Sequence, residues 1–190
     1  ADDNLVDGTI TSTITIAVDD ANSDDEFDSV DDQTVSATTT DDDVAGFTVT
    51  ETDGSTAVAE SGTTDTFTVV LDAQPTTDVV LTITSSDTGE ASVAPSSLIF
   101  TPANWDTPQT VTVTGEDESV VDGDQTSNIT VAVFDTASDD SFDVLDDQTV
   151  DVTTTDDDVA GFTVAETDGS TSVDESGTTD TFTVVLDAQP

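Results

Sequence analysis

The chain contains no lysine, arginine or histidine, whereas it has 44 aspartate and glutamate residues, so its formal net charge is −44. Salt bridges between its side chains are therefore excluded. Direct binding to nucleic acid or to an anionic membrane is excluded as well, because both depend on Lys and Arg. A compact fold that carries charge of one sign repels itself unless cations compensate. We therefore expect the protein to work in an ion-rich medium.

Cysteine, methionine and tyrosine are also absent, and there is a single tryptophan. Without Cys and His, no Ser–His or Cys–His nucleophile pair and no zinc site of nitrogen and sulfur ligands can form. The remaining donors are carboxylates, hydroxyls and amides, which are hard oxygen ligands suited to Ca²⁺ or Mg²⁺. Paired carboxylates could serve glycoside hydrolysis, but the few aromatic residues do not indicate a substrate cleft. The composition predicts a protein that is not an enzyme.

Long apolar segments are missing too. No run of 18 apolar residues is present, so we expect no membrane insertion in this segment. No basic region is followed by an apolar stretch, so no signal peptide is predicted within it.

What the chain does contain is a long repeat. Residues 41–49 return as 156–164, an offset of 115 (156 − 41), and residues 71–75 return at the same offset as 186–190. Over 41–75 against 156–190 the copies differ at only 3 of 35 positions. Such self-similarity indicates an array of like modules. We predict a complete module at 44–158, the C-terminal part of a preceding module at 1–43 and the N-terminal part of a following module at 159–190.

The chain is therefore interpreted as an excerpt from a longer array. Alternatively, the two partial copies could complete each other between two chains by strand exchange. It is less favoured, because the two fragments together would still lack the counterpart of 76–115.

Apolar and polar residues alternate with a period of two, most strictly at 110–114, and Thr, Val, Phe and Ile dominate these runs. This pattern is typical of half-buried strands, and Gly-, Pro- and Asp-containing turns separate the runs. About seven short strands per module indicate an all-β fold, an immunoglobulin-like β-sandwich repeated end to end. Strands are predicted at 46–50 with 56–59, 65–71, 79–85, 91–100 (one strand or two short ones), 109–114, 126–134 and 148–154.

Trp105 follows the turn-forming residues 101–104. We expect it to be a core or loop-anchoring aromatic that closes one end of the sandwich. A platform for stacking carbohydrate is the alternative interpretation.

Acidic residues gather between the predicted strands, at 41–43, 116–118, 122 with 124, 139–140, 146–147 and 156–158. Ca²⁺ takes six to eight oxygen ligands with flexible geometry, so it suits carboxylates from several loops. A metal at an Asp triplet between two modules would stiffen the joint. From composition alone, a solvated acidic surface of a salt-adapted protein explains the clusters equally well.

Several motifs, in order and spacing, resemble a Calx-beta domain over the whole repeat. They are 59–62 (AESG) with its copy 174–177 (DESG), then 66–71 (TFTVVL), 98–102 (LIFTP), 109–113 (QTVTV), the acidic loop 116–124 and the closing 152–158 (VTTTDDD). The resemblance implies a seven-stranded sandwich that binds Ca²⁺ through loops at one end. This family occurs in sodium–calcium exchangers, in integrin cytoplasmic regions and in tandem in large extracellular surface proteins of microbes.

The resemblance also implies a ligand set. Carried over by position, the Ca²⁺ ligands would be Glu60, Asp117, Asp122, Asp156, Asp157 and Asp158, with Asp87 and then Glu90 as candidates from the middle loop. The partial copies add Asp2, Asp7, Asp41, Asp42, Asp43 and Glu175. The chain departs from the family in two ways. It has no Tyr for the family's Asp-Tyr pair in the middle loop, and Asp122 stands where the family commonly has Glu.

The leading functional hypothesis is a structural module of a long extracellular or cell-surface fibre or adhesin, rigidified by Ca²⁺. Its partners would be other copies of the module, lateral copies in a fibre and divalent cations. Three alternatives remain at this stage. One is an acidic, salt-adapted surface or scaffold protein without specific Ca²⁺ sites, and another is a Ca²⁺-sensing module, which predicts unlike copies. The third is a scaffold for mineral or ice, which needs a regular ladder of groups on one face.

Overall fold

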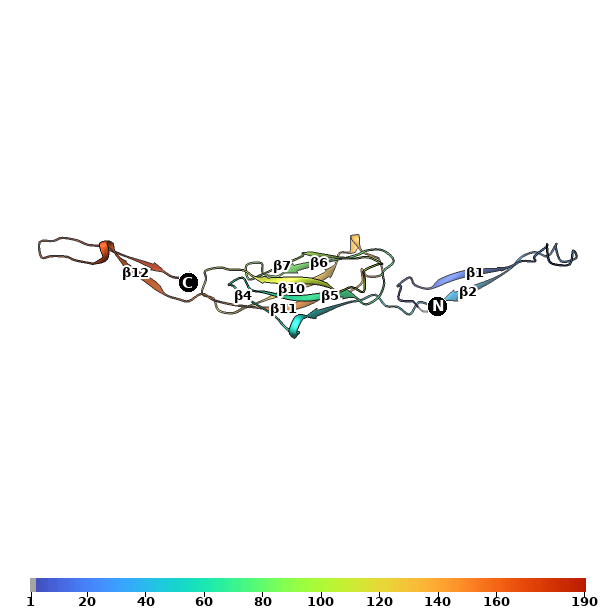
Figure 1. The fold of residues 1–190 in the computed structure, drawn as a ribbon, viewed down its shortest axis with the longest axis horizontal. Coiled ribbons are helices and arrows are strands. Elements are labelled where there is room, and N and C mark those ends of the chain that lie inside the picture. The colour runs from blue at the N-terminus through green and yellow to red at the C-terminus, as the bar shows by residue number, and fades with distance from the viewer. Residues whose placement is uncertain (1–2) are drawn as a thin grey trace.

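The computed structural model describes residues 3–190, so the predicted ligand Asp2 lies outside the described residues. A central sandwich lies between two hairpins that extend from its opposite ends (Figure 1). The N-terminal hairpin pairs β1 (Ile10–Ile16) with β2 (Gln33–Thr39), and the C-terminal one pairs β12 (Phe162–Glu166) with β13 (Phe182–Leu186). Among residues 3–190, no helix has the length and apolar character to cross a bilayer.

The sandwich holds nine strands at the predicted places, with the predicted 91–100 segment divided into two. They are β3 (Phe47–Glu51), β4 (Thr56–Ala59), β5 (Thr64–Leu71), β6 (Val79–Ser85), β7 (Ala91–Ala94), β8 (Ser97–Phe100), β9 (Gln109–Gly115), β10 (Gln125–Val133) and β11 (Gln148–Thr155). Short 3-10 turns lie at Thr52–Gly54, Asp135–Ala137 and Thr167–Gly169.

The strands form two sheets, one with the order β3-β5-β9-β7 and one with the order β4-β11-β10-β6-β8. The chain passes from the four-stranded to the five-stranded sheet between β3 and β4 at one edge of the sandwich. It does so again between β7 and β8 at the other edge. With these two changes of sheet, the order is that of immunoglobulin domains, in which strands A, B, E and D face strands C, F and G. Strand β4 pairs in parallel with β11, whereas its neighbours pair antiparallel. The predicted immunoglobulin-like all-β fold is confirmed.

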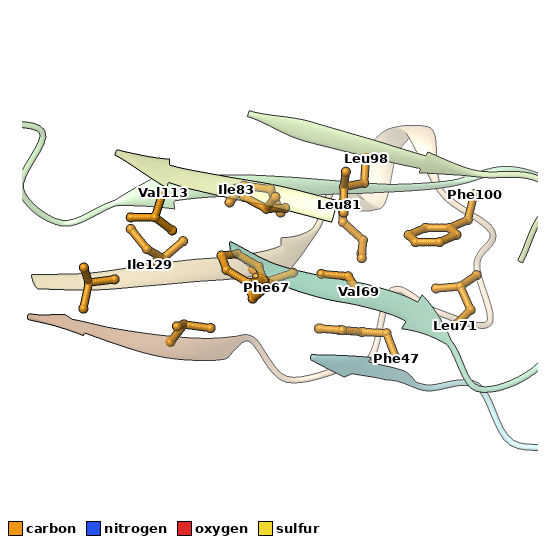
Figure 2. Packing of buried hydrophobic residues seen from close by; sticks show 14 of the residues in the cluster. Phe47, Phe67, Val69, Leu71, Leu81, Ile83, Leu98, Phe100, Val113 and Ile129 are labelled. Atoms are coloured by element: carbon orange, nitrogen blue, oxygen red, sulfur yellow. The ribbon is translucent and has the colours of Figure 1, made fainter. Parts of the chain in front are cut away.

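The core lies between the inner faces of the two sheets (Figure 2). In β9, Val111 and Val113 are fully buried while the intervening threonines face outward, which is the predicted alternation. Phe67, Phe100 and Phe142 are the largest side chains that are fully buried. Burial of each such side chain contributes roughly 1.5–3 kcal/mol. Trp105 is partly buried against this cluster, as a loop-anchoring aromatic is.

The strands of the sandwich carry very little charge. Their acidic residues are Glu51, Asp65 and Asp151. The outer face of the four-stranded sheet is instead rich in threonine, and Thr50, Thr68 and Thr110 stand opposite one another on three adjacent strands. The negative charge of the module is therefore concentrated in the loops.

The two hairpins repeat the pairing of the sandwich without its second sheet. Ile10 pairs with Thr39 as Gln125 pairs with Thr154, and Phe162 pairs with Leu186 as Phe47 pairs with Leu71. Burial is nevertheless very different, because Phe162 is 65% exposed and Phe47 is 4% exposed. Local pairing therefore follows from the repeated sequence alone, whereas burial requires the facing sheet.

Candidate metal centre

Four segments with acidic residues meet at one end of the sandwich, called here the acidic end. They are the turn after β4 (60–63), the β6–β7 loop (86–90), the β9–β10 loop (116–124) and the triplet after β11 (156–158). They meet because β4, β6, β9 and β11 all run toward this end.

Glu60 is placed by the tight turn that follows β4. Its backbone N–H donates to the Thr155 carbonyl at 3.1 Å, which continues the parallel pairing with β11. The Gly62 and Thr63 N–H groups both donate to the Ala59 carbonyl, and Gly62 has a φ of +82°, which favours glycine. The turn closes directly over the core, and Glu60 is completely buried.

Gly115, the last residue of β9, lets β4 approach this closely. A Cβ atom added at Gly115 would lie 2.1 Å from the Ala59 carbonyl oxygen and 2.7 Å from its carbon. The Gly115 N–H donates to the Thr63 carbonyl at 3.0 Å. Only glycine fits here, so Gly115 allows the close approach of β4 to β9 that positions Glu60 in the acidic end.

Neither oxygen of the buried Glu60 carboxylate accepts a hydrogen bond of ordinary geometry. Burial raises the pKa of Glu60, and the negative charges of Asp156, Glu90 and Glu118 raise it further. The backbone N–H of Asp157 opposes this rise only in part. A buried charge without a partner is strongly unfavourable, so this carboxylate requires a proton or a cation.

Two groups of carboxylates share Glu60. One oxygen from each of Glu60, Asp156 and Asp158 lies within 4.8 Å of the others, and the same holds for Glu60, Glu118 and Asp122. Two oxygens bound to one Ca²⁺ at 2.3–2.6 Å lie at most about 5 Å apart. Each group therefore has the spacing of a Ca²⁺ ligand set.

Further buried oxygens without a hydrogen-bond partner face the same region. They belong to Glu90, Glu118 and Asp158. Burial, followed by the charges of Asp122 and Glu118, raises the pKa of Glu90. Burial, followed by the charges of Asp156 and Asp157, raises the pKa of Asp158. Most buried polar atoms in proteins are hydrogen-bonded, so this concentration of unpaired oxygens makes the acidic end a candidate cation site.

Asp156 ties the triplet to the β9–β10 loop. Its Oδ2 accepts from the Gly123 N–H at 2.8 Å, and its Oδ1 accepts from the Asp158 N–H at 2.8 Å. The preceding copy repeats this geometry, since Asp41 accepts from the Gly8 N–H at 2.7 Å and from the Asp43 N–H at 2.9 Å. The hydrogen bonds from Asp43 and Gly8 lower the pKa of Asp41.

The structure brings some of the predicted ligands together and leaves others apart. Glu60, Asp122, Asp156 and Asp158 converge. Three other predicted ligands are exposed at the rim and belong to neither group: Asp87, Asp117 and Asp157. The charges of Asp87 and Asp117 and the backbone N–H of Asp157 nevertheless shift the pKa of carboxylates in the acidic end. Glu118 was not among the predicted ligands, although it lies in the acidic run 116–118 that the sequence does show.

The partial copies hold the remaining predicted ligands. Asp7, Asp41, Asp42 and Asp43 line one cavity with Asp3, the counterpart of Glu118. Glu175, the counterpart of Glu60, is exposed in the β12–β13 hairpin. Neither set is among the close groups found in residues 3–190. The ligand roles of these residues stay predictions.

Asp139, from another acidic run, is an internal hydrogen-bond acceptor at the opposite end of the sandwich. Its Oδ2 accepts from the backbone N–H groups of Thr76 and Thr77 at 2.8 and 2.9 Å, and Oδ1 accepts from the Ser141 N–H at 3.0 Å. Burial alone would raise the pKa of Asp139, but hydrogen bonds from Thr76, Ser141 and Thr77 lower it to about 2. The ionised carboxylate thus fastens the β10–β11 loop to the start of β6.

Asp139→Asn should therefore destabilise the fold in a pH-dependent way. The pKa falls from 3.8 to about 2 on folding, which corresponds to about 2 kcal/mol. This stability is present above pH 3.8 and is lost as the pH falls through about 2. Urea unfolding should show the variant less stable than the wild type at pH 7, with a difference that narrows below pH 4. Asp140→Asn, at the exposed neighbour, is the control, and a difference independent of pH would contradict this role.

No protein-family model matches the chain, and no curated protein matches it. The chain is similar to the E. coli chaperone DraB, with 11% sequence identity and a TM-score of 0.44, over 63% of this chain and 58% of DraB. It is similar to domains 4 and 5 of the S-layer protein SbsC, with 20% identity and a TM-score of 0.38, over 65% and 63% of the two chains.

A PapD-like domain of human CEP192 is similar as well, with 12% identity and a TM-score of 0.41, over 60% of this chain and 86% of that one. At these identities the similarities concern the fold alone. The immunoglobulin-like assignment rests on the strand order of the chain itself.

Proposed function

We propose that the repeat is a structural module of a long extracellular or cell-surface fibre or adhesin, and that it binds Ca²⁺ at its acidic end. The observation that carries the proposal is Glu60, whose buried carboxylate accepts no hydrogen bond of ordinary geometry and is surrounded by carboxylates from other loops. Removing a carboxylate from water costs several kcal/mol unless a counter-charge is present. A cation among these loops supplies that charge.

The donor set favours Ca²⁺ over other metals. All of the converging groups are carboxylates, and Ca²⁺ takes six to eight oxygen ligands with flexible geometry. Mg²⁺ demands near-octahedral geometry at shorter distances and keeps several waters, so it suits such a crowded site less well. Because Glu60 belongs to both groups, it would be the ligand that the two groups have in common.

The position of the site supports a mechanical role. The triplet 156–158 leads directly into the next copy, and the β9–β10 loop lies beside it. Ions held between these segments would stiffen the connection between modules, so that an array becomes a rod. Near-identical copies favour such a repeated structural role over a sensor, which would need unlike modules.

Thermal unfolding of the 190-residue chain, with Ca²⁺ and with a chelator at matched ionic strength, tests the proposal. Free Ca²⁺ at one hundred times its dissociation constant adds about 2.7 kcal/mol. We therefore expect the midpoint to rise by about 10 °C, and Mg²⁺ at the same concentration to raise it much less. If Na⁺, Mg²⁺ and Ca²⁺ act alike at equal ionic strength, the acidic end is a screened surface of a salt-adapted protein and the proposal fails.

A further inference from the structure

A segment of the N-terminal copy lies against the central sandwich and pairs with it. The Val6 N–H donates to the Gln74 carbonyl at 2.9 Å, and the Gln74 N–H donates to the Asn4 carbonyl at 2.7 Å. Leu5 thus stands opposite Gln74 in a parallel bridge. The Val6 side chain, which comes from outside the sandwich, packs against its hydrophobic core.

The same main-chain pairing recurs at the other end of the sandwich, 115 residues later. The Val121 N–H donates to the Gln189 carbonyl at 3.0 Å, the Gln189 N–H donates to the Ser119 carbonyl at 2.6 Å, and Val120 stands opposite Gln189. The chain therefore shows one junction twice, between the β9–β10 loop of one copy and the loop after β5 of the next.

The receiving loop is itself held in place. Gln74 donates from Nε2 to the Pro102 carbonyl at 2.8 Å, which fastens it to the β8–β9 loop of the same sandwich. Its neighbour Ala73 is buried. The incoming segment therefore meets a fixed backbone edge beside the core.

We propose that the acidic loop of each module is a docking element that completes the next module. Its partner is a second copy of this module, presenting the loop after β5, and its anchor is the valine at Val6 or Val121. Docking uses main-chain hydrogen bonds and apolar contact, which suits a chain with no cationic side chain to form salt bridges between copies. The contact is directional, because the acidic loop of one copy docks on the loop after β5 of the copy that follows it in sequence.

The docked residues 119–121 lie between the candidate ligands Glu118 and Asp122. Ca²⁺ bound at one module would therefore hold the segment that packs on the next. This Ca²⁺ dependence rests on the proposed function, whereas the docking itself does not. Stability would pass along the array by nearest-neighbour contacts, as in other repeat proteins.

Val6→Ser in the 190-residue chain tests the docking, because Val6 lies outside the sandwich it contacts. In chelator, the unfolding midpoint of the sandwich should fall by about 4 °C. Val144→Ser, the same change at a side chain that is 83% exposed, should leave the midpoint unchanged. Val6→Ala is the milder variant and should lower the midpoint in the same direction.

Amide hydrogen exchange is an independent test of the docking, because the Gln74 N–H donates to the Asn4 carbonyl in the docking segment. Exchange at Gln74 should speed up at least tenfold in Val6→Ser, while exchange at the core residue Val111 changes far less. Equal midpoints for Val6→Ser and Val144→Ser, together with unchanged exchange at Gln74, would overturn the docking proposal. That result is separate from the Ca²⁺ experiment, since both measurements are made in chelator.

Discussion

Glu60→Gln should raise the unfolding midpoint of the Ca²⁺-free protein and remove most of the stabilisation that Ca²⁺ gives. The wild-type carboxylate is fully buried, accepts no hydrogen bond of ordinary geometry, and lies close to Asp156 and Glu118. An amide of nearly the same shape carries no charge to desolvate and no repulsion from these neighbours. We expect a rise of at least about 4 °C in chelator, as for roughly 1 kcal/mol of added stability.

With saturating Ca²⁺ the order should reverse. On the proposed function, the wild type gains the free energy of Ca²⁺ binding, whereas the variant has lost the ligand common to both groups. Calorimetry should show Ca²⁺ affinity weakened at least tenfold. Asp106→Asn, at an exposed loop position away from the acidic end, makes the same change of charge and should alter neither midpoint nor affinity appreciably. A variant destabilised equally with and without Ca²⁺ would show that Glu60 is only a packing residue.

Lowering the pH should stabilise the Ca²⁺-free wild type, as the uncharged amide stabilises Glu60→Gln. Because folding raises the pKa of Glu60 and Glu90, protonation stabilises the folded state. This stabilisation is complete below the ordinary glutamate pKa of 4.5 and is lost as the pH rises through the raised values. The advantage of Glu60→Gln in chelator should therefore shrink as the pH falls from 7 toward 4.5. Asp139 does not interfere, because it titrates near 2.

The strands could be predicted from the sequence because each is specified locally. Alternation of Val and Thr in 109–115 determines which side chains of β9 face the core. The pairing of β10 with β11 and of β3 with β5 persists in the hairpins, which lack a facing sheet. Whether 91–100 forms one strand or two could not be predicted from alternation alone. In the structure the buried positions change phase, from Ala91 in β7 to Leu98 and Phe100 in β8, where the segment passes from one sheet to the other.

The candidate site was predicted less completely, since it depends on contacts distant in sequence. Glu60 and the triplet were identified by resemblance, and the structure brings Glu60, Asp156 and Asp158 together. Glu118 was missed because composition cannot say which member of an acidic run turns inward. Asp87 and Asp117 were also predicted as ligands by resemblance, yet both are exposed at the rim. The inward direction of each carboxylate is determined by the turn that carries it.

Gly115 shows how such a turn is determined, and Gly115→Ala should disrupt both the fold and the site. The added Cβ would overlap the Ala59 carbonyl, which is backbone and cannot rotate away. Strand β4 would have to move from β9 and carry Glu60 with it. Overpacking of this kind typically costs about 1–3 kcal/mol. Urea unfolding in chelator should show a loss at the upper end of this range.

The same displacement should weaken Ca²⁺ binding, although Gly115 has no side chain to offer as a ligand. We expect calorimetry of the folded variant to show affinity reduced at least tenfold, because Glu60 would no longer lie within 4.8 Å of its partners. Thr112→Ala, on the outward face of the same strand, is the control and should leave the affinity unchanged. A Gly115→Ala protein that loses stability but keeps its affinity would show that β4 and Glu60 move independently. The position of the buried carboxylate would then depend on β11 and the triplet rather than on the contact between β4 and β9.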